Sequence, residues 1–165
     1  MNILSPIISN FSVVATSEKF IVEDNFVVNT DDSVFVIIFY IGGNFKSWFI
    51  NKIEDTFATS IIYGRNLIKN SVDKPILNEL GGQEKAETTL TEIYAMMKNQ
   101  SDGKVGNLLT KGSANIFYVR DINNTLRAVG VDWNDDGWRV GACSVEDPRA
   151  WNAGDRVFSR NSSEA

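Results

Sequence analysis

The stretch from Ala114 to Ser144, ANIFYVRDINNTLRAVGVDWNDDGWRVGACS, contains three short segments rich in β-branched and aromatic residues. The segments 114–120, 125–133 and 138–144 are separated by the turn-forming sequences DINN and NDDG. Clusters of Asn, Asp and Gly between such segments are typical of β-hairpins. We therefore predict a C-terminal β-meander of three antiparallel strands.

The facing of side chains in the second hairpin follows from strand alternation. The turn is either a two-residue loop of Asp136 and Gly137 or a four-residue loop, and the two pairings differ by an even shift, so the same residues share a face. One face then carries Val129, Val131, Trp133, Trp138, Val140 and Ala142. The opposite face carries Ala128, Gly130, Asp132, Arg139, Gly141 and Cys143. Facing glycines indicate that another chain element or a ligand approaches the sheet closely there.

The N-terminal third is predicted to form hairpins. Residues 11–15 and 19–29 show short strand-like patterns, and the run SVFVIIFYI at 33–41 predicts a central strand covered on both faces. After Gly42–Asn44 the chain is expected to return as a partner strand at 45–50. Residues 51–70 fit a helix and a strand equally well, and we leave them open.

Helical signals lie in the middle of the chain. Asp73 and Pro75 are typical of a helix start, and the glycines at 81 and 82 would end that helix. A main helix is predicted at about 84–99, because Ala86, Leu90, Ile93, Tyr94 and Met97 form one apolar stripe.

Together these segments predict an α+β fold, with a mostly antiparallel sheet packed against one main helix at about 84–99. The sheet would combine N-terminal hairpins with the C-terminal β-meander and a last strand at 156–160. The length of 165 residues suits a single α+β domain, 1–165, with sub-lobes 1–72 and 83–160 as an alternative division.

The composition excludes several chemistries. The chain has no histidine and one cysteine, Cys143, so it cannot build a Ser-His-Asp triad, a His-containing zinc site or an internal disulfide. The motif Asp132-x-Asn134-x-Asp136-Gly137 starts like a calcium loop, but Cys143 stands where that loop needs Glu. We find no catalytic motif, and we expect a non-enzymatic protein with no cofactor, no metal and no catalytic residues.

Charge and hydropathy limit the partners. The net charge of −5 opposes binding to nucleic acid and makes a basic partner electrostatically easier than an acidic one. The longest apolar run, 34–41, is far shorter than the ~20 residues of a membrane helix. The N-terminus has no basic segment or cleavage signal, so we expect an intracellular, cytoplasmic protein. Whether it forms a homo-oligomer is left open.

Arginine and tryptophan gather towards the C-terminus. Six of the seven arginines and three of the four tryptophans follow Lys111. Both residue types are enriched at binding hot spots, so the leading hypothesis is a protein–protein interaction module with an Arg/Trp-rich C-terminal surface. The candidate binding residues are Trp151, Arg149, Asp132, Arg139, Arg127 and Asn152.

The tryptophans are expected to differ in role. Trp133 and Trp138 alternate with apolar strand residues and fit a core, whereas Trp151 lies in the loop 146–154 and is expected to be more exposed and offered to a partner. An alternative hypothesis is a carbohydrate-binding module that uses Trp and Asp or Asn side chains. A third is a metal-dependent hydrolase that uses carboxylate pairs such as Asp135 with Asp136.

The absence of imidazole and of paired thiolates generates a first prediction. Protein purified without chelator should contain no stoichiometric zinc, because the ligands that zinc prefers are missing. Elemental analysis checks this, and about one zinc per chain would contradict it.

Overall fold

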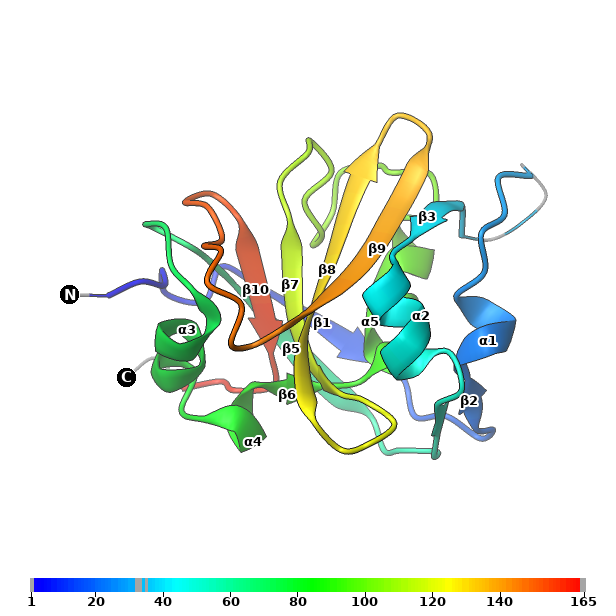
Figure 1. Ribbon diagram of the computed structural model, residues 1–165, viewed down its shortest axis with the longest axis horizontal. Helices are drawn as coiled ribbons and strands as arrows, with labels where there is room; N and C mark the ends of the chain where they lie inside the picture. The colour runs from blue at the N-terminus through cyan, green and yellow to red at the C-terminus, as the bar shows by residue number, and fades with distance from the viewer. Residues whose placement is uncertain (1, 32–33, 35, 164–165) are drawn as a thin grey trace.

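The computed structural model describes residues 2–31, 34 and 36–163 (Figure 1). Its main strands are β1 (Ser9–Val13), β3 (Ile38–Ile41), β5 (Ser60–Asn66), β6 (Glu87–Thr88), β7 (Asn115–Arg120), β8 (Leu126–Asn134), β9 (Gly137–Ser144) and β10 (Arg156–Ser159). Within the described residues they form one eight-stranded sheet in the order β1-β5-β10-β7-β8-β9-β3, with β6 beside β7. The predicted α+β class with a mostly antiparallel sheet is confirmed.

Strand β7 lies at the centre of this sheet. It pairs with β8 along its whole length, while β10 and β6 share its other edge in parallel register. Residues 115–119 are all buried. Phe117 and Val119 point into one core, and Ile116 and Tyr118 point into a second core on the opposite face. Both faces of the sheet therefore need a cover.

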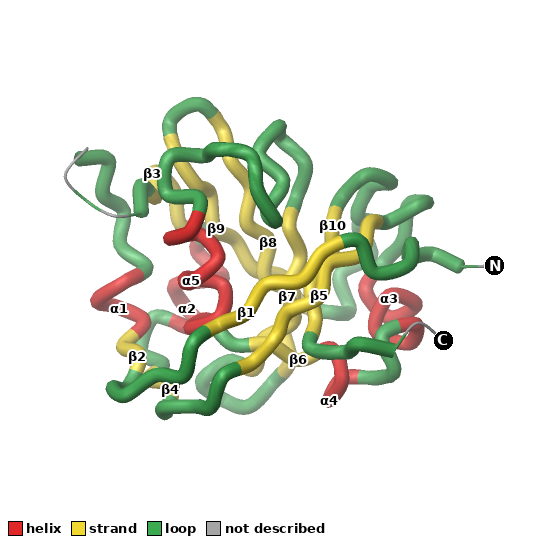
Figure 2. The backbone as a smooth tube through the Cα atoms, turned by 180° about the vertical axis from the view of Figure 1, so that it is seen from behind, coloured by secondary structure: helices red, strands yellow, loops and turns green. Residues whose placement is uncertain are grey.

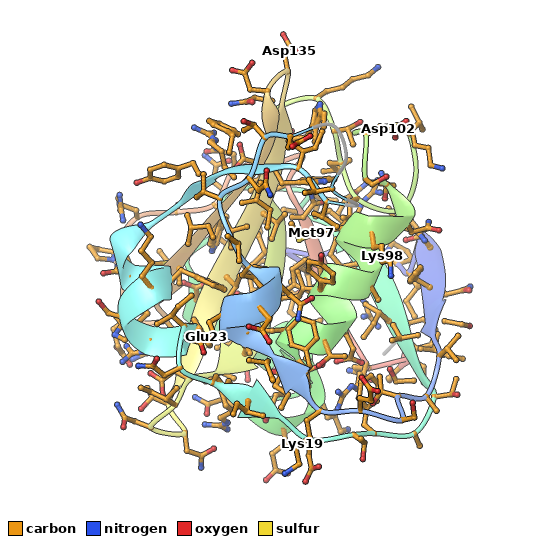
Figure 3. The ribbon with its side chains drawn as sticks, turned by 90° about the vertical axis from the view of Figure 1, so that its right-hand side faces the viewer. Lys19, Glu23, Met97, Lys98, Asp102 and Asp135 are labelled. Atoms are coloured by element: carbon orange, nitrogen blue, oxygen red, sulfur yellow. The ribbon has the colours of Figure 1, made fainter. Side chains whose placement is uncertain are left out.

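Helices cover both faces. α1 (Val22–Asn25), α2 (Gly43–Phe49) and α5 (Leu90–Asn99) supply the first core, and α3 (Asp73–Glu79) and α4 (Gln83–Ala86) supply the second. Figures 1 and 2 show α3 and α4 at one end of the molecule and α1, α2 and α5 at the other. Figure 3 shows Met97 on the side of α5 that faces the sheet, where it is fully buried.

The expected main helix at 84–99 is interrupted. α4 ends at Ala86, β6 follows, and α5 begins after Thr89. Ala86 belongs to the second core and Leu90 to the first, so the chain crosses from one face of the sheet to the other between them. A straight helix cannot make that crossing. The side chains of Thr89 and Glu92 form a capping box that starts α5.

Two N-terminal predictions are wrong. The strand in the run 33–41 covers only Ile38–Ile41 and lies at the edge of the sheet, not at its centre, while residues 33 and 35 lie outside the described residues. The segment expected as a partner strand at 45–50 is helix α2. Phe45, Trp48 and Phe49 follow helical i, i+3, i+4 spacing, and Phe45 and Phe49 are fully buried.

Several other segments are settled by the structure. The open segment 51–70 contains β4 (Ile53–Glu54) and β5, so it is a strand region. The segment 19–29 contains β2 (Phe20–Ile21) and α1, and β2 and β4 pair with each other outside the main sheet. The helix predicted from Asp73 is confirmed as α3. None of the helices in the described part of the chain is both long and apolar enough to cross a lipid bilayer.

The predicted C-terminal meander is confirmed together with its register. Trp133 pairs with Trp138 and Gly130 pairs with Gly141, as in the four-residue-loop alternative, and the ladder extends one step further to Asn134 and Gly137. The apolar face of this hairpin packs into the first core. Its other face, with the two glycines, lies on the side of α3.

The burial of Trp138 generates a stability prediction. Its side chain is fully buried, so Trp138→Ala should lower the free energy of unfolding by about 3–5 kcal/mol through the cavity it leaves. Trp138→Phe should cost clearly less, because the indole Nε1 has no hydrogen-bond partner among the described residues that would be lost. Urea unfolding measures both, with the exposed Val105→Ala as a control that should stay within about 0.5 kcal/mol.

Candidate functional site

An open groove of about 420 Å³ lies on the glycine face of the β8–β9 hairpin. The helices on this face, α3 and α4, contribute to the core over β7 and β10, and beyond them the segment 145–155 runs from β9 back to β10 (Figure 1). The sheet beside that segment is not covered by a helix. The groove lining is mostly apolar and includes Tyr40, Arg139, Gly141, Cys143, Arg149 and Trp151.

The two paired glycines of the groove differ in what covers them. A Cβ atom added at Gly130 would meet Cη2 of Trp151 at 3.3 Å, so Trp151 is the element whose close approach the glycine pair predicts. A Cβ atom added at Gly141 would meet nothing within 4 Å. Gly141 therefore forms an open floor, and no side chain of the described residues accounts for its missing Cβ.

Trp151 is held in place by several hydrogen bonds. Its N–H and C=O pair with the backbone of Ser71 at 2.8 and 3.1 Å, and its indole Nε1 donates to Oδ1 of Asp73 at 2.8 Å. The side chain is half-buried and packs on the second core. Trp151 is thus more exposed than Trp138, as expected, but it is partly buried, as Trp133 is, because β7 and α3 supply a polar anchor that the local loop sequence does not reveal.

Asp73, the first residue of α3, is the buried anchor of this arrangement. Its Oδ1 accepts hydrogen bonds from the Tyr118 hydroxyl at 2.7 Å and from Trp151, whereas its buried Oδ2 has no partner among the described residues. Burial raises the pKa of Asp73 above its ordinary value and outweighs the two donors, and the charge of Asp147 adds to the increase. Burial likewise raises the pKa of the Cys143 thiol to about 11.

The arginines of the groove are already paired within the chain. Arg139 donates through Nε to Oδ2 of Asp132 at 2.9 Å, and Arg149 donates through Nη2 to Oδ2 of Asp147 at 3.0 Å. The hydrogen bond from Arg149 lowers the pKa of Asp147. Each guanidinium is thus matched by one carboxylate, and the rim carries no excess charge from these four residues.

Four of the six predicted binding residues line the groove: Trp151, Arg149, Asp132 and Arg139. The other two lie elsewhere. Arg127 stacks on the ring of Trp48, with 3.7 Å between its Cζ and the ring centroid, and pairs with Asp121 on the opposite face of the sheet. Asn152 is exposed beyond the groove, and its N–H donates to Asp155.

Tyr40 is a groove residue that sequence reasoning missed. It lies on β3, pairs with Arg139 of β9 in parallel register, and is 55% exposed. The pairing joins strands about a hundred residues apart, and the apolar run around Tyr40 carries no signal for it.

The carboxylate pairs considered for hydrolysis do not form a cluster. Among residues 2–31, 34 and 36–163, no group of three or more Cys, Asp or Glu side chains could hold a metal ion. Figure 3 shows Asp135 at the tip of the β8–β9 hairpin, pointing away from the molecule. Glu146 pairs with Lys74 on the surface.

Comparison with known proteins does not assign the chain to a family. The chain matches no protein family model, no curated protein and no solved structure. A functional interpretation therefore depends on the geometry of the groove.

Asp73→Asn tests the buried anchor through pH. In the unfolded chain an aspartate titrates near 3.9, and the native pKa of Asp73 lies higher. Between the two values the native chain holds more protons than the unfolded chain, so this group makes the free energy of unfolding fall as pH rises. Asn keeps an acceptor for Tyr118 and Trp151 but does not ionise, so the stability of the variant relative to wild type should increase from pH 4 to pH 8.

Urea unfolding at several pH values measures this difference. Asp121→Asn is the control, because hydrogen bonds from Arg127 and from backbone N–H groups outweigh burial and lower the pKa of Asp121. The stability that Asp121 contributes is therefore complete at neutral pH and is lost only as pH falls below the ordinary aspartate value, so this variant should show no rise relative to wild type between pH 4 and pH 8. A pH-independent difference between Asp73→Asn and wild type would show that Asp73 does not carry a raised pKa.

Proposed function

We propose that the chain is a non-enzymatic protein–protein interaction module whose binding site is the groove over Gly141. The open floor at Gly141 carries this proposal, since a strand glycine with nothing above it leaves room for a group from another molecule. The groove volume falls within the ~300–1,000 Å³ of typical ligand sites, towards the lower end.

The residue types around the groove support a protein partner. Tyr40, Arg139, Arg149 and Trp151 belong to the three residue types that dominate binding hot spots. Arg149 is well exposed beside the groove, so its guanidinium plane and methylene groups can contact a partner while its ion pair with Asp147 stays in place. The net charge of −5 would steer basic surfaces towards the chain.

A carbohydrate site is less well supported. Stacking on a sugar ring needs a free tryptophan face. Trp138 is fully buried, and Gly103 lies against the ring of Trp133, where an added Cβ would come within 2.0 Å of Cε2. Trp151 approaches Gly130 with the ring atoms Cη2 and Cζ3, and its indole N–H is already used by Asp73, so it has no donor left for a sugar hydroxyl.

Filling the groove tests the proposal. Gly141→Leu should fold normally, because the new side chain starts in open space on a strand, and it should reduce capture of the binding partner by about tenfold or more, ~1.4 kcal/mol. Gly141→Ala should reduce capture much less. Affinity capture from native cells with quantitative mass spectrometry measures the difference, and thermal unfolding confirms that the variants are folded.

Ser12→Leu is the matched control. It adds the same side chain at an exposed strand position on β1, at the opposite end of the sheet. Capture should be unchanged by this variant. If proteins captured by wild type are retained in full by folded Gly141→Leu, the groove is not the binding site.

A further inference from the structure

The groove is built to receive a side chain and not a strand. β9 is paired with β8 along its length, and on its other side the carbonyls of Val140 and Ala142 accept from Gly42 N–H at 2.9 Å and from Asn44 Nδ2 at 3.1 Å. These backbone acceptors are used within the chain. Addition of a partner strand to β9 would have to displace them, whereas the space directly above Gly141 is open, since an added Cβ atom meets nothing within 4 Å there.

The charge of the groove selects an uncharged side chain. Arg139 and Arg149 are each paired with a carboxylate of the same chain, so the rim holds matched charges. A charged side chain entering the groove would lose hydration without finding an unpaired opposite charge on the rim, which is unfavourable. An uncharged apolar side chain meets a lining that is mostly apolar and leaves both ion pairs in place.

The two aromatic side chains that border the groove, Tyr40 and Trp151, favour an aromatic ring as the occupant. Tyr40 borders the floor beside Arg139, and Trp151 borders it on the side of Gly130. Tyr40 is 55% exposed, so a partner can bury additional aromatic surface there. Aromatic pairs are stabilised by about 0.5–1.5 kcal/mol beyond the area that they bury. The hydrogen bond from Trp151 to Asp73 fixes the second wall before any partner arrives, which lowers the entropy cost of binding.

We infer that the groove binds an uncharged aromatic side chain of a protein partner, seated on the backbone of Gly141 between Tyr40 and Trp151. This inference rests on the proposed function and specifies the chemistry of the partner at that site. The partner contributes one anchor residue, and the arginine–aspartate pairs on the rim surround it.

A panel of single-residue probes tests the chemistry directly. The N-acetyl amides of tryptophan, leucine, lysine and glutamate are titrated into the ¹⁵N-labelled chain, and the amide resonances of Gly130, Gly141 and Cys143 are followed by NMR. We expect the tryptophan amide to shift these resonances with an affinity about tenfold or more above that of the lysine and glutamate amides, with leucine between them. The shifts should disappear in Gly141→Leu and persist in Ser12→Leu.

The other outcomes overturn the inference. Shifts that are as large with the lysine or glutamate amide would show a charged anchor, and shifts with N-acetylglucosamine alone would show a sugar site. Concentration-dependent shifts without any probe would show that a second copy of the chain occupies the groove. The absence of groove shifts with every amide also contradicts the aromatic anchor.

The two proposals fail separately. If Gly141→Leu abolishes capture of a partner but the amides give no preference for tryptophan, the interaction site stands and the aromatic anchor is wrong. If capture is unaffected by Gly141→Leu, the proposed function is wrong whatever the amides show.

Discussion

The burial of β7 on both faces is the constraint on which the rest of the structure depends. Five consecutive residues of this strand, 115–119, are buried, and their alternate side chains enter two separate cores. A sheet with two apolar faces needs cover on both. The chain supplies it by crossing the sheet at β6, which is why the helical region 83–99 is divided into α4 and α5 on opposite faces. On the side of α3 and α4 the cover does not extend over β9, and the groove lies there.

The anchor at Asp73 connects that groove to the core. One carboxylate oxygen accepts from Tyr118 of β7 and from Trp151 of the connecting segment, so a residue at the start of α3 joins three elements. Burying this carboxyl group is unfavourable for its charged form, and its second oxygen gains no compensating hydrogen bond among the described residues. The benefit is geometric, since Trp151 is placed over Gly130 and forms a fixed wall of the groove.

The sequence predicts those parts of the fold that local periodicity determines. Alternation and turn residues suffice for the register of β8 and β9, including the facing glycines. The same alternation places Arg127 on the face of the sheet that carries Val129, opposite to the face that carries Arg139. Non-local pairing is not predictable in this way. The apolar run before Gly42 looks like a central strand, yet β3 joins the edge of the sheet because β9 accepts it in parallel register. Tyr40 and Asp73 reach the groove region only through such distant contacts.

Gly141 gives the clearest physical reason to look for a partner outside the chain. Glycine within a strand is destabilising by roughly 0.5–1 kcal/mol relative to alanine, because it loses more backbone freedom on folding. At Gly130 this cost is offset by the close packing of Trp151, which an added Cβ would crowd. At Gly141 an added Cβ would meet nothing, so no packing of the described residues offsets the cost. In the proposed function, the contact that uses this open position forms when a side chain of another molecule occupies the groove.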